Sequence, residues 1–449
     1  MTEEKIRDLI TKAQRPGEIA TKWHRLCRGK IQITAKCPIN SLEDLSVWYT
    51  PGVAAPCREI EKNKERVYEL TNKWNTIAVI TDGSRVLGLG NIGPEAGLPV
   101  MEGKALLFKY LGGVDAVPIC LDTDEADDII RAVKWLQPSF AGINLEDLAN
   151  PKCFYILDTL RNEMSIPVWH DDQQGTAVVT LAGLINALKV VGKSKKEVGI
   201  TVIGVGAANV AIARMLIVDG FKPERFILVD SKGILHRNRK DLEISKIKNP
   251  YKWEFCEITN QQGKTGGIAE ALVGTDVCIA LSGSGPGIIR PEWVKTMADN
   301  AIIFACANPV PEIWPWEAKE AGAKVVATGR SDFPNQVNNS LAFPAIFRGT
   351  LDVQASSLTN EMLLAAAYEL ARCAEEKGLS EDYIIPSMEE GDVFIREAVA
   401  VGLKAIEQGV ARNVMSQNQL FRQAKQIIEN SRDSIEVLMR SDLIQPVVK

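Results

Sequence analysis

Two pairs of adjacent carboxylates are the residues of this sequence best suited to chemistry. Glu146 and Asp147 end one strand-like run, and Asp171 and Asp172 follow a short apolar run twenty-five residues later. The second pair alone fits an ordinary helix start, because aspartate is favoured near the first turn of a helix. Two acidic strand ends that converge, however, would form the oxygen-lined site that Mg²⁺ or Mn²⁺ prefers. We therefore predict a divalent-metal site at these two pairs.

A glycine-rich turn indicates a nucleotide site. Residues 198–203 are typical of a buried strand, and a turn with Gly204 and Gly206, a helix and a second strand ending in Asp230 follow. This order is the Rossmann-type dinucleotide fingerprint, in which the glycines allow close approach of the pyrophosphate and the acid receives the ribose hydroxyls. Asn209 replaces the third glycine, so the match is partial.

The choice between NAD and NADP stays open at this point. Asp230 favours free ribose hydroxyls and therefore NAD. Lys232, Arg237 and Arg239 follow closely in the sequence, and their charges would suit the 2′-phosphate of NADP.

Three further side chains have roles that depend on their surroundings. Arg85 lies in a loop with four glycines, where a guanidinium suits bidentate binding of a carboxylate. Lys104 opens an apolar helical run and is usually a surface residue there, but burial near a metal would lower its pKa and make it a base. Tyr49 precedes a Thr-Pro-Gly turn, and this stretch alone favours a packed aromatic side chain.

The pattern of strands and helices predicts the elements that position these residues. Apolar runs of strand length alternate with helical patterns, which is typical of a parallel sheet in an α/β protein. The expected strands cover residues 76–80, 116–120, 140–145, 166–169, 198–203, 225–230, 276–281, 301–305 and 323–327.

Several helix boundaries are predicted from local signals. The helix after the second acidic pair should end before Gly192, because glycine commonly follows the last turn. A second helix is expected to begin at Lys104 and a third to cover 210–218. Asp392 and Ser416 are expected to cap helices in the C-terminal part.

We therefore expect an α/β fold with three parts. A Rossmann-type NAD(P)-binding domain with a parallel sheet covers residues 175–355. An N-terminal α/β domain at 1–174 carries the substrate and metal residues. A helical segment at 356–449 packs back on the other two. A chain of 449 residues is long enough for such a division.

Composition excludes several classes of partner. The net charge of −5 gives no electrostatic reason to expect binding to nucleic acid or to an anionic membrane. No run reaches the eighteen or so apolar residues of a membrane span, and the charged start lacks the apolar core of a signal peptide. The nine cysteines form no Cys-x-x-Cys pair, which suggests reduced, mostly buried thiols and a cytoplasmic protein.

Several motifs, taken together and in order, resemble those of the malic enzyme family. The resemblance covers about residues 20–400, and the length is similar to that of the shorter prokaryotic-type subunit. The motifs are Tyr-Thr-Pro-Gly-Val-Ala at 49–54, Thr-Asp-Gly-Ser-Arg-Val-Leu-Gly-Leu-Gly-Asn at 81–91, Glu-Gly-Lys-Ala at 102–105, Glu-Asp at 146–147, His-Asp-Asp-Gln-Gln-Gly-Thr-Ala at 170–177, the glycine fingerprint at 204, Cys-Ala-Asn-Pro at 306–309 and Asn-Asn-Ser at 338–340.

The resemblance implies roles for individual residues at the reacting centre. Glu146, Asp147 and Asp172 would bind the metal. Lys104 would take the proton of the C2 hydroxyl, with Asp171 as its orienting partner. These roles match the chemistry, because oxidation of a 2-hydroxy acid requires a base and a cofactor that accepts hydride.

The resemblance also implies residues for the acid step, the substrate and the cofactor. Tyr49 would protonate C3 of the enol, Arg85 would bind a malate carboxylate, and Asn308 and Asn339 would orient substrate and nicotinamide. His170 stands where many relatives have asparagine, and we expect it to pack beside the site without binding the metal. The residues expected at the cofactor are Thr176, Gly204, Gly206, Ala207, Ala208, Asn209, Asp230, Ser231, Asn308 and Asn338.

The implied activity is oxidative decarboxylation of malate to pyruvate and CO₂, with NAD or NADP and with Mg²⁺ or Mn²⁺, in a homodimer or higher homo-oligomer. One alternative is a metal-dependent oxaloacetate decarboxylase with weak redox activity, which the largely intact fingerprint disfavours. The other is a catalytically silent nucleotide sensor. A sensor would need neither Tyr49 nor Lys104, so the presence of both disfavours it.

Overall fold

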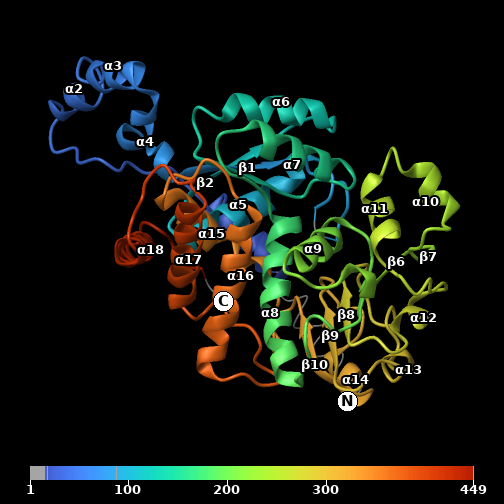
Figure 1. Ribbon diagram of the computed structural model, residues 1–449. Coiled ribbons are helices and arrows are strands. Elements are labelled where there is room, and N and C mark those ends of the chain that lie inside the picture. Colours follow the sequence, from blue (N-terminus) through green and yellow to red (C-terminus); the bar gives the residue numbers. More distant parts are fainter. Residues whose placement is uncertain (1–15, 18, 87, 448–449) are drawn as a thin grey trace.

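The structure, a computed structural model, describes residues 16–17, 19–86 and 88–447. Two sheets form its framework (Figure 1). The first has four parallel strands in the order β2-β1-β3-β4, and the second has six in the order β10-β9-β8-β5-β6-β7, of which only β7 is antiparallel. The strands are β1 (Thr76–Thr81), β2 (Asp115–Cys120), β3 (Gly142–Leu145), β4 (Val168–His170), β5 (Ile200–Ile203), β6 (Phe226–Asp230), β7 (Gly233–Ile234), β8 (Val277–Ala280), β9 (Ala301–Ala305) and β10 (Ala323–Thr328). Each of the nine expected strands is therefore present within a few residues of its predicted position.

The helices of the N-terminal half cover the four-stranded sheet. Helix α5 packs on β1 and β2, and α7 packs on α6 and β4. A separate group of short helices precedes the sheet, at the upper left of Figure 1. The elements are α2 (Asp44–Trp48), α3 (Ala54–Lys62), η1 (Lys64–Arg66), α4 (Val67–Leu70), η2 (Asn72–Asn75), α5 (Pro94–Gly112), α6 (Ala126–Leu136) and α7 (Lys152–Glu163).

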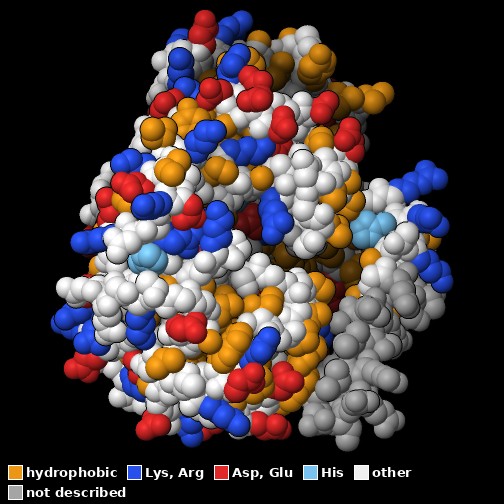
Figure 2. All heavy atoms as spheres, turned by 90° about the vertical axis from the view of Figure 1, so that its right-hand side faces the viewer, with side chains coloured by type: hydrophobic (Ala, Val, Ile, Leu, Met, Phe, Trp, Pro, Cys, Tyr) orange, Lys and Arg blue, Asp and Glu red, His pale blue; other side chains and the backbone are white. Residues whose placement is uncertain are grey.

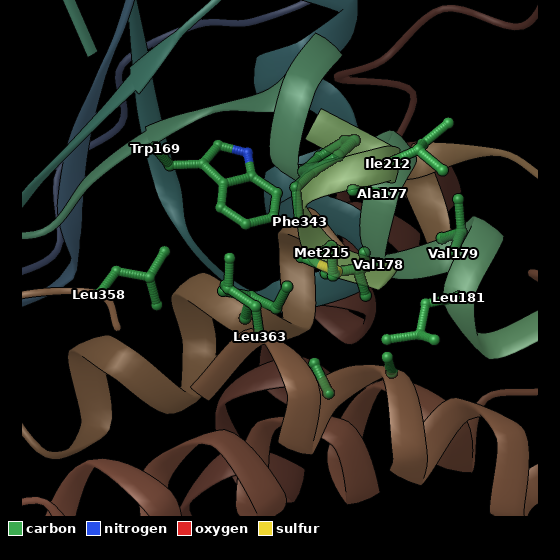
Figure 3. Packing of buried hydrophobic residues seen from close by; sticks show 14 of the residues in the cluster. Trp169, Ala177, Val178, Val179, Leu181, Ile212, Met215, Phe343, Leu358 and Leu363 are labelled. Carbon is green, nitrogen blue, oxygen red and sulfur yellow. The ribbon is translucent and has the colours of Figure 1, made fainter. Parts of the chain in front are cut away.

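A short π-helical turn, η3 (Asp171–Gly175), joins β4 to the long helix α8 (Thr176–Val191). Helix α8 ends as predicted before Gly192, whose left-handed φ of 69° closes the last turn. It packs on α9 and α16, and most of its residues are buried. Figure 3 shows its side chains Ala177, Val178, Val179 and Leu181 among the apolar core.

One described helical stretch, Asp171–Val191, is long and apolar enough to cross a membrane. Its most apolar window is 72% buried inside the protein, which is the behaviour of a core helix. Length and composition alone are weak grounds for a span, and the packing accounts for the apolar character of this helix.

Further helices cover the six-stranded sheet, which carries the glycine fingerprint. Helices α15, α16, α17 and α18 follow its last strand in the sequence. Helices α15, α16 and α18 each pack on α17, and α15 and α18 also contact α5. The remaining elements are α9 (Ala207–Val218), η4 (Pro223–Arg225), α10 (Lys240–Ser245), α11 (Pro250–Ile258), α12 (Ile268–Leu272), α13 (Pro291–Val294), α14 (Pro315–Glu320), η5 (Asn339–Leu341), α15 (Phe343–Asp352), α16 (Asn360–Lys377), α17 (Asp392–Glu407) and α18 (Gln417–Arg440).

Three predicted helix starts are wrong. Helix α5 begins at Pro94, ten residues before Lys104, because Pro94 suits the first helical position and burial of Met101 and Phe108 offsets the proline at Pro99. Helix α9 begins at Ala207 and not at 210. Asp392 is the first residue of α17 rather than its cap, whereas Ser416 caps α18 as predicted, accepting a hydrogen bond from the Gln419 backbone N–H.

Candidate active site

The centre of the site is a buried lysine between two carboxylates. Lys104 of α5 makes an ion pair with Asp171 Oδ2 and a second one with Glu146 Oε1 at 3.0 Å. All three side chains are buried. The ring of Phe343 lies 4.3 Å from the ammonium, measured to the ring centroid. Lys104 is therefore not the surface residue that the sequence alone allowed.

Strand register explains why these acids meet. Strands β3 and β4 are parallel neighbours, and Leu145 pairs with His170. The next residue on each strand is an acid, so Glu146 and Asp171 emerge side by side at the same edge of the sheet. Strand β1 pairs with β3 on its other side, with Ile80 opposite Leu145, and brings the Asp82–Arg85 loop to that edge.

Asp171 is held by three side chains. Besides Lys104, the Trp169 indole N–H donates to Asp171 Oδ1 at 3.2 Å. Asn339 Nδ2 donates to Asp171 Oδ2 at 2.6 Å. Asn339 lies in η5, which follows the last strand of the six-stranded sheet, so this bond joins the two halves of the molecule at the acid.

The charges determine the protonation of the cluster. Burial lowers the pKa of the Lys104 ammonium, but the adjacent carboxylates of Asp171 and Glu146 outweigh burial and raise the pKa above its usual range. Burial raises the pKa of Glu146 well above its usual value, and Asp171, Asp172 and Asp147 add to this rise. In this arrangement acids surround the ammonium and raise its pKa, and the fall expected beside a bound metal stays a prediction.

The three residues expected to bind the metal lie next to one another at this edge. The Asp147 backbone N–H donates to Asp172 Oδ2 at 3.0 Å, and Asp147 has a left-handed φ of 53°. Among the described residues, however, no three such side chains surround a common point. Glu146 faces Lys104, and the Asp172 carboxylate accepts the Asp147 N–H.

The donor set nevertheless fits a divalent cation. Carboxylate oxygens are the ligands that Mg²⁺ and Mn²⁺ prefer. The like charges that raise the pKa of Glu146 are a repulsion that a dication would relieve. Metal binding by Glu146, Asp147 and Asp172 stays a prediction.

Sequence reasoning missed two residues that support the cluster. Asn144 Nδ2 donates to Glu146 Oε2 at 2.8 Å. Lys152 pairs with the buried Asp82 at 2.5 Å. The one polar residue inside the apolar run at 140–145 was the available signal for Asn144, because such a run is typical of a strand that is buried on both faces. Nothing in the sequence links Lys152 to Asp82, because 70 residues separate them.

His170 is buried completely and lies beside the acids. Its Nδ1 is 3.8 Å from Asp172 Oδ2, and burial lowers the pKa of its imidazole. Neither ring nitrogen has a hydrogen-bond partner among the described residues. A neutral packing residue, as expected from the sequence, fits these facts.

The nucleotide fingerprint lies directly beside the acids, because α9 packs on η3. Gly204 has a left-handed φ of 94°, and a Cβ there would approach the Leu281 carbonyl oxygen to 2.8 Å, so glycine is required. No atom lies within 4 Å of a Cβ at Gly206. Asn209 is buried, and its Nδ2 donates to the Ile203 and Gly204 carbonyl oxygens at 2.8 and 3.0 Å. This asparagine therefore fixes the turn in place of the third glycine.

The end of β6 forms a cavity of about 530 Å³ lined by Asp230, Ser231, Lys232 and Arg239 among others. Both oxygens of Asp230 are engaged. Arg239 donates to Oδ1 at 3.2 Å and to Oδ2 at 3.3 Å, and Lys252 donates to Oδ2 at 3.2 Å. Burial alone would raise the pKa of Asp230, but these bonds lower it. Arg237, the third cation expected here, donates instead to the Glu257 carbonyl oxygen.

The other predicted site residues take different positions. Arg85 is exposed, and its backbone N–H donates to the Asp147 carbonyl oxygen at 2.9 Å. Asn308 is exposed after β9, and Asn338 accepts from Ser340 N at 2.9 Å. Thr176 begins α8, directly after the acidic turn. Tyr49, at the end of α2, is the one catalytic residue of the prediction that does not join the Lys104 cluster.

The molecule is hollowed where its two halves meet. Figure 2 shows a depression in the middle of this face, with an acidic side chain at its floor and basic side chains at its rim. A cavity of about 580 Å³ between the first half and the α10–α11 segment is lined by Ser84, Asn91, Lys152 and Tyr251 among others. Small ligands commonly bind in such clefts between domains.

Two protein-family models match separate parts of the chain. The family described as "Malic enzyme, N-terminal domain" matches residues 28–128, and "Malic enzyme, NAD binding domain" matches residues 173–406. A Bacillus subtilis protein named bifunctional malic/malolactic enzyme is 47% identical over 410 residues, which are 91% of this chain and 98% of the relative. The NAD-dependent malic enzyme of Geobacillus stearothermophilus is 48% identical over 86% of this chain and 78% of its own. The NADP-dependent malic enzyme of Escherichia coli is 42% identical over 85% of this chain, which spans about half (51%) of that relative.

Solved structures agree with this fold. The malic enzyme of Entamoeba histolytica superposes with a TM-score of 0.95 at 45% identity, over 100% of this chain and 93% of its own. The malic enzyme of Pyrococcus horikoshii superposes with a TM-score of 0.88 at 50% identity, over 92% of this chain and 95% of its own.

Proposed function

The chain belongs to the malic enzyme family, and we propose that it converts L-malate to pyruvate and CO₂ while reducing NAD or NADP. The observation that carries this proposal is the bond from Asn339 to Asp171. It holds the loop after the nucleotide-type sheet against the buried lysine and its acids. This bond supports a scheme in which a base and a hydride acceptor share one cleft, as oxidation of a 2-hydroxy acid requires.

Lys104 acts as the base in this scheme. In its neutral form, which a dication beside Glu146 would favour, its amine takes the proton of the C2 hydroxyl. The bound cofactor would accept the hydride from C2, and a 3-oxo acid would remain. Asp171 holds the Lys104 amine in place and is itself oriented by Trp169 and Asn339. Loss of CO₂ then leaves an enolate, and the Tyr49 hydroxyl returns a proton to C3 to give pyruvate.

A divalent metal and a dinucleotide cofactor would complete the site. Mg²⁺ or Mn²⁺, held by Glu146, Asp147 and Asp172, would supply Lewis-acid stabilisation of negative charge on the C2 oxygen. The cofactor, NAD or NADP, would supply the hydride acceptor. Its contacts would come from Thr176, Gly204, Gly206, Ala207, Ala208, Asn209, Asp230, Ser231, Asn308 and Asn338.

Substrate carboxylates would be bound at the rim. Arg85 is exposed next to Asp147, where its guanidinium can receive a malate carboxylate in bidentate fashion. Asn308 and Asn339 would orient malate against the nicotinamide. Asn339 already contacts the cluster through Asp171.

The proposal extends to organisation of the chain. We propose a catalytic N-terminal domain at 1–174, an NAD(P)-binding domain at 175–355 and a helical segment at 356–449. The free thiols of all nine cysteines support a cytoplasmic location. A homodimer or higher homo-oligomer is proposed by family resemblance.

Initial rates with malate, Mn²⁺ and each cofactor in turn test this function. Cofactor reduction should follow malate addition, and Lys104→Ala should lower kcat by about 10²- to 10⁴-fold, the range of a general base. Lys109→Ala is the matched control, because Lys109 lies on the same helix and pairs with the half-exposed Asp115 at 2.8 Å. Near-normal malate oxidation by Lys104→Ala would show that another group is the base. Oxaloacetate decarboxylation without malate-dependent cofactor reduction would favour the decarboxylase alternative.

A further inference from the structure

A cavity beside the acidic turn η3 lies apart from the residues proposed for catalysis. Its volume is about 220 Å³, and residues of α7, η3, α8, α9 and α16 line it. None of the residues proposed to bind metal, malate or the dinucleotide is among them. Helix α7 belongs to the first half of the molecule and α9 to the nucleotide-type half, so the cavity lies where the two halves meet.

The cavity has a buried floor and a rim that is open to solvent. Leu157, Gln174 and Met215 are buried, whereas Asp158 and Asn360 are exposed. The volume is below the range of about 300–1,000 Å³ that pockets for drug-sized ligands occupy. A ligand of this cavity is therefore small and reaches it from the rim.

Most of the wall is apolar. The apolar side chains come from α7, α8, α9 and α16 and include Leu157, Ala177, Met215, Val218, Leu363 and Leu364. Figure 3 shows Ala177, Met215 and Leu363 in the apolar core, so this part of the wall is continuous with the packed interior. Such a wall favours a ligand with a hydrocarbon chain.

At the rim, one cation lacks a carboxylate partner. Arg161 of α7 is half-buried, and its Nη2 donates to the Leu358 carbonyl oxygen at 2.8 Å and to Asn360 Oδ1 at 3.3 Å. Both acceptors are neutral, and Arg161 makes no ion pair within the described part of the chain. Burial lowers the pKa of its guanidinium, although Asp158 and Glu361 oppose that fall. A guanidinium in this setting suits bidentate binding of a carboxylate.

The other two charges of the lining already have partners. Arg214 of α9 pairs with Glu254 at 2.7 Å, and its guanidinium lies 4.9 Å from the centroid of the Tyr251 ring. Asp158 accepts a hydrogen bond from the Tyr251 hydroxyl at 3.5 Å. Two arginines and one aspartate give the lining one net positive charge, which a monoanion would balance.

On the floor, a buried donor lacks an acceptor. Gln174 of η3 is 6% exposed, and its Oε1 accepts the His170 backbone N–H at 3.0 Å. Its Nε2 has no hydrogen-bond partner among the described residues. A buried donor without a partner is costly, by about 1–3 kcal/mol. Because Gln174 lines the cavity, a neutral oxygen of a ligand can accept this hydrogen bond.

We propose that the cavity is an effector site for a small oxo-monocarboxylate, a carboxylate with a ketone further along its chain. The carboxylate binds Arg161, the ketone oxygen accepts a hydrogen bond from Gln174, and the apolar wall covers the carbon chain between them. A dicarboxylate fits less well, because the lining has a single net positive charge.

Occupation of this site should affect turnover through η3. Gln174 holds the His170 N–H and shares the turn with Asp171, which pairs with Lys104. A ligand that joins Gln174 to Arg161 fixes the turn against α7. We expect kcat/KM for malate to rise about fivefold, at the lower end of typical couplings between sites. This effect rests on the proposed function, whereas the binding does not.

Calorimetric titration of the full chain with 4-oxopentanoate tests the binding. We expect saturable binding of one molecule per chain. Pentanoate, which lacks the ketone, and 2-pentanone, which lacks the carboxylate, should each bind at least about tenfold more weakly. Pentanoate that binds as well as 4-oxopentanoate overturns the contact with Gln174. Absence of saturable heat means that the cavity holds only water and overturns the proposal.

Two variants test the position of the ligand. Ala211→Leu fills the cavity from its α9 wall, and Arg161→Gln removes the cation while the cavity stays open. Each should weaken binding of 4-oxopentanoate at least about tenfold. Ala365→Leu is the matched control, because Ala365 is a half-buried alanine of α16 outside the lining. Undiminished binding by both test variants places the ligand elsewhere and overturns the site.

Initial rates with malate separate this site from the proposed reaction. Saturating 4-oxopentanoate should raise kcat/KM in the wild type and in Ala365→Leu, and it should have no effect in Ala211→Leu. Binding at the cavity without a change in kcat/KM overturns the effector role. A chain that does not oxidise malate at all contradicts the proposed function, and the titrations still decide whether the cavity binds the oxo acid.

Discussion

At the scale of single residues, burial decides what the titratable groups can do. Lys104, Asp171 and Glu146 lie in the interior, where an unpaired charge is costly and a paired one needs close partners. The lysine bridges both acids, and each acid has a further donor, Asn339 for Asp171 and Asn144 for Glu146. This arrangement holds the amine at a defined position in the cleft.

Glu312 is a second buried acid, and it joins two loops at the nucleotide side. It is fully buried, and its carboxylate accepts hydrogen bonds from Ser282 N at 3.0 Å and from Ala307 N at 3.1 Å. These backbone groups follow β8 and β9. Burial raises the pKa of Glu312 from its usual 4.5 to about 7, although the two N–H groups favour the charged form.

This pKa predicts a pH-dependent stability. A carboxyl group whose pKa is raised on folding contributes stability that is present below pH 4.5 and is lost as the pH rises through 7. The free energy of unfolding should therefore decrease by about 3 kcal/mol from this group over that interval. In Glu312→Gln that part of the slope should disappear, as measured by urea unfolding at several pH values.

The comparison concerns the slope and not the absolute stability. Glutamine can accept only one of the two N–H groups, so Glu312→Gln should be destabilised by a constant amount at every pH. If the free energies of unfolding of the two proteins changed in parallel between pH 4.5 and 7, Glu312 would have an ordinary pKa.

At the scale of elements, the π-helical turn η3 sets the direction of the acids. It follows β4 directly and continues into α8, so Asp171 and Asp172 project from a rigid join between strand and helix. Gly175 closes the turn with a φ of −63°, which any residue can adopt. A Cβ there would nevertheless lie 2.2 Å from Asp171 Oδ1.

Gly175→Ala should therefore affect chemistry more than folding. The added methyl group must displace the Asp171 carboxylate and with it the Lys104 amine, and a misplacement of about 1 Å can lower the rate by about 10²-fold. The stability should decrease by about 1–3 kcal/mol, as for other overpacked sites. Steady-state rates and thermal unfolding measure the two effects.

Gly199→Ala is the matched control for this substitution. Its Cβ would meet nothing closer than 3.8 Å, and its φ is not left-handed. It should therefore keep the wild-type kcat. Equal losses of kcat in both variants would mean that the contact with Asp171 is not the cause.

At the scale of the whole molecule, a cluster of buried polar side chains joins three segments that are far apart in the sequence. Arg348 and Asp352 pair within α15 at 2.8 Å, with neither exposed. Arg348 also donates to Asn75 Oδ1 of η2 at 2.6 Å, and Gln423 of α18 donates to Asp352 Oδ1 at 2.8 Å. The segment just before β1 and the last helix are thereby tied to the same point of the core.

Removal of one charge should be more harmful than removal of both. Arg348→Met should destabilise the protein by about 3–5 kcal/mol, because it leaves the buried Asp352 without its cation. The double variant Arg348→Met with Asp352→Leu should recover much of that loss. Urea unfolding of the single and double variants measures the difference. A double variant no more stable than Arg348→Met would show that the hydrogen bonds to Asn75 and Gln423, rather than the charge pair, hold the segments together.

The sequence by itself determined the elements and the order of the chemistry-bearing residues. Apolar runs of strand length located the strands and helical spacing located α8, because such runs are typical of buried strands and such spacing of a helix face that packs in the core. The glycine fingerprint indicated the nucleotide-binding half, and the acids indicated the sheet edge at which we propose the reaction, since such motifs act through local backbone geometry. Their resemblance to the malic enzyme family identified the activity.

Only the tertiary structure decided how those residues face one another. The pairing of Leu145 with His170 places Glu146 beside Asp171, and no local pattern encodes the register of two strands. Burial of Lys104 between carboxylates, the engagement of Asp230 by Arg239 and the outward position of Tyr49 likewise depend on segments far apart in the sequence. These contacts are set by packing of whole elements, and a side chain's partner, pKa and exposure follow from that packing.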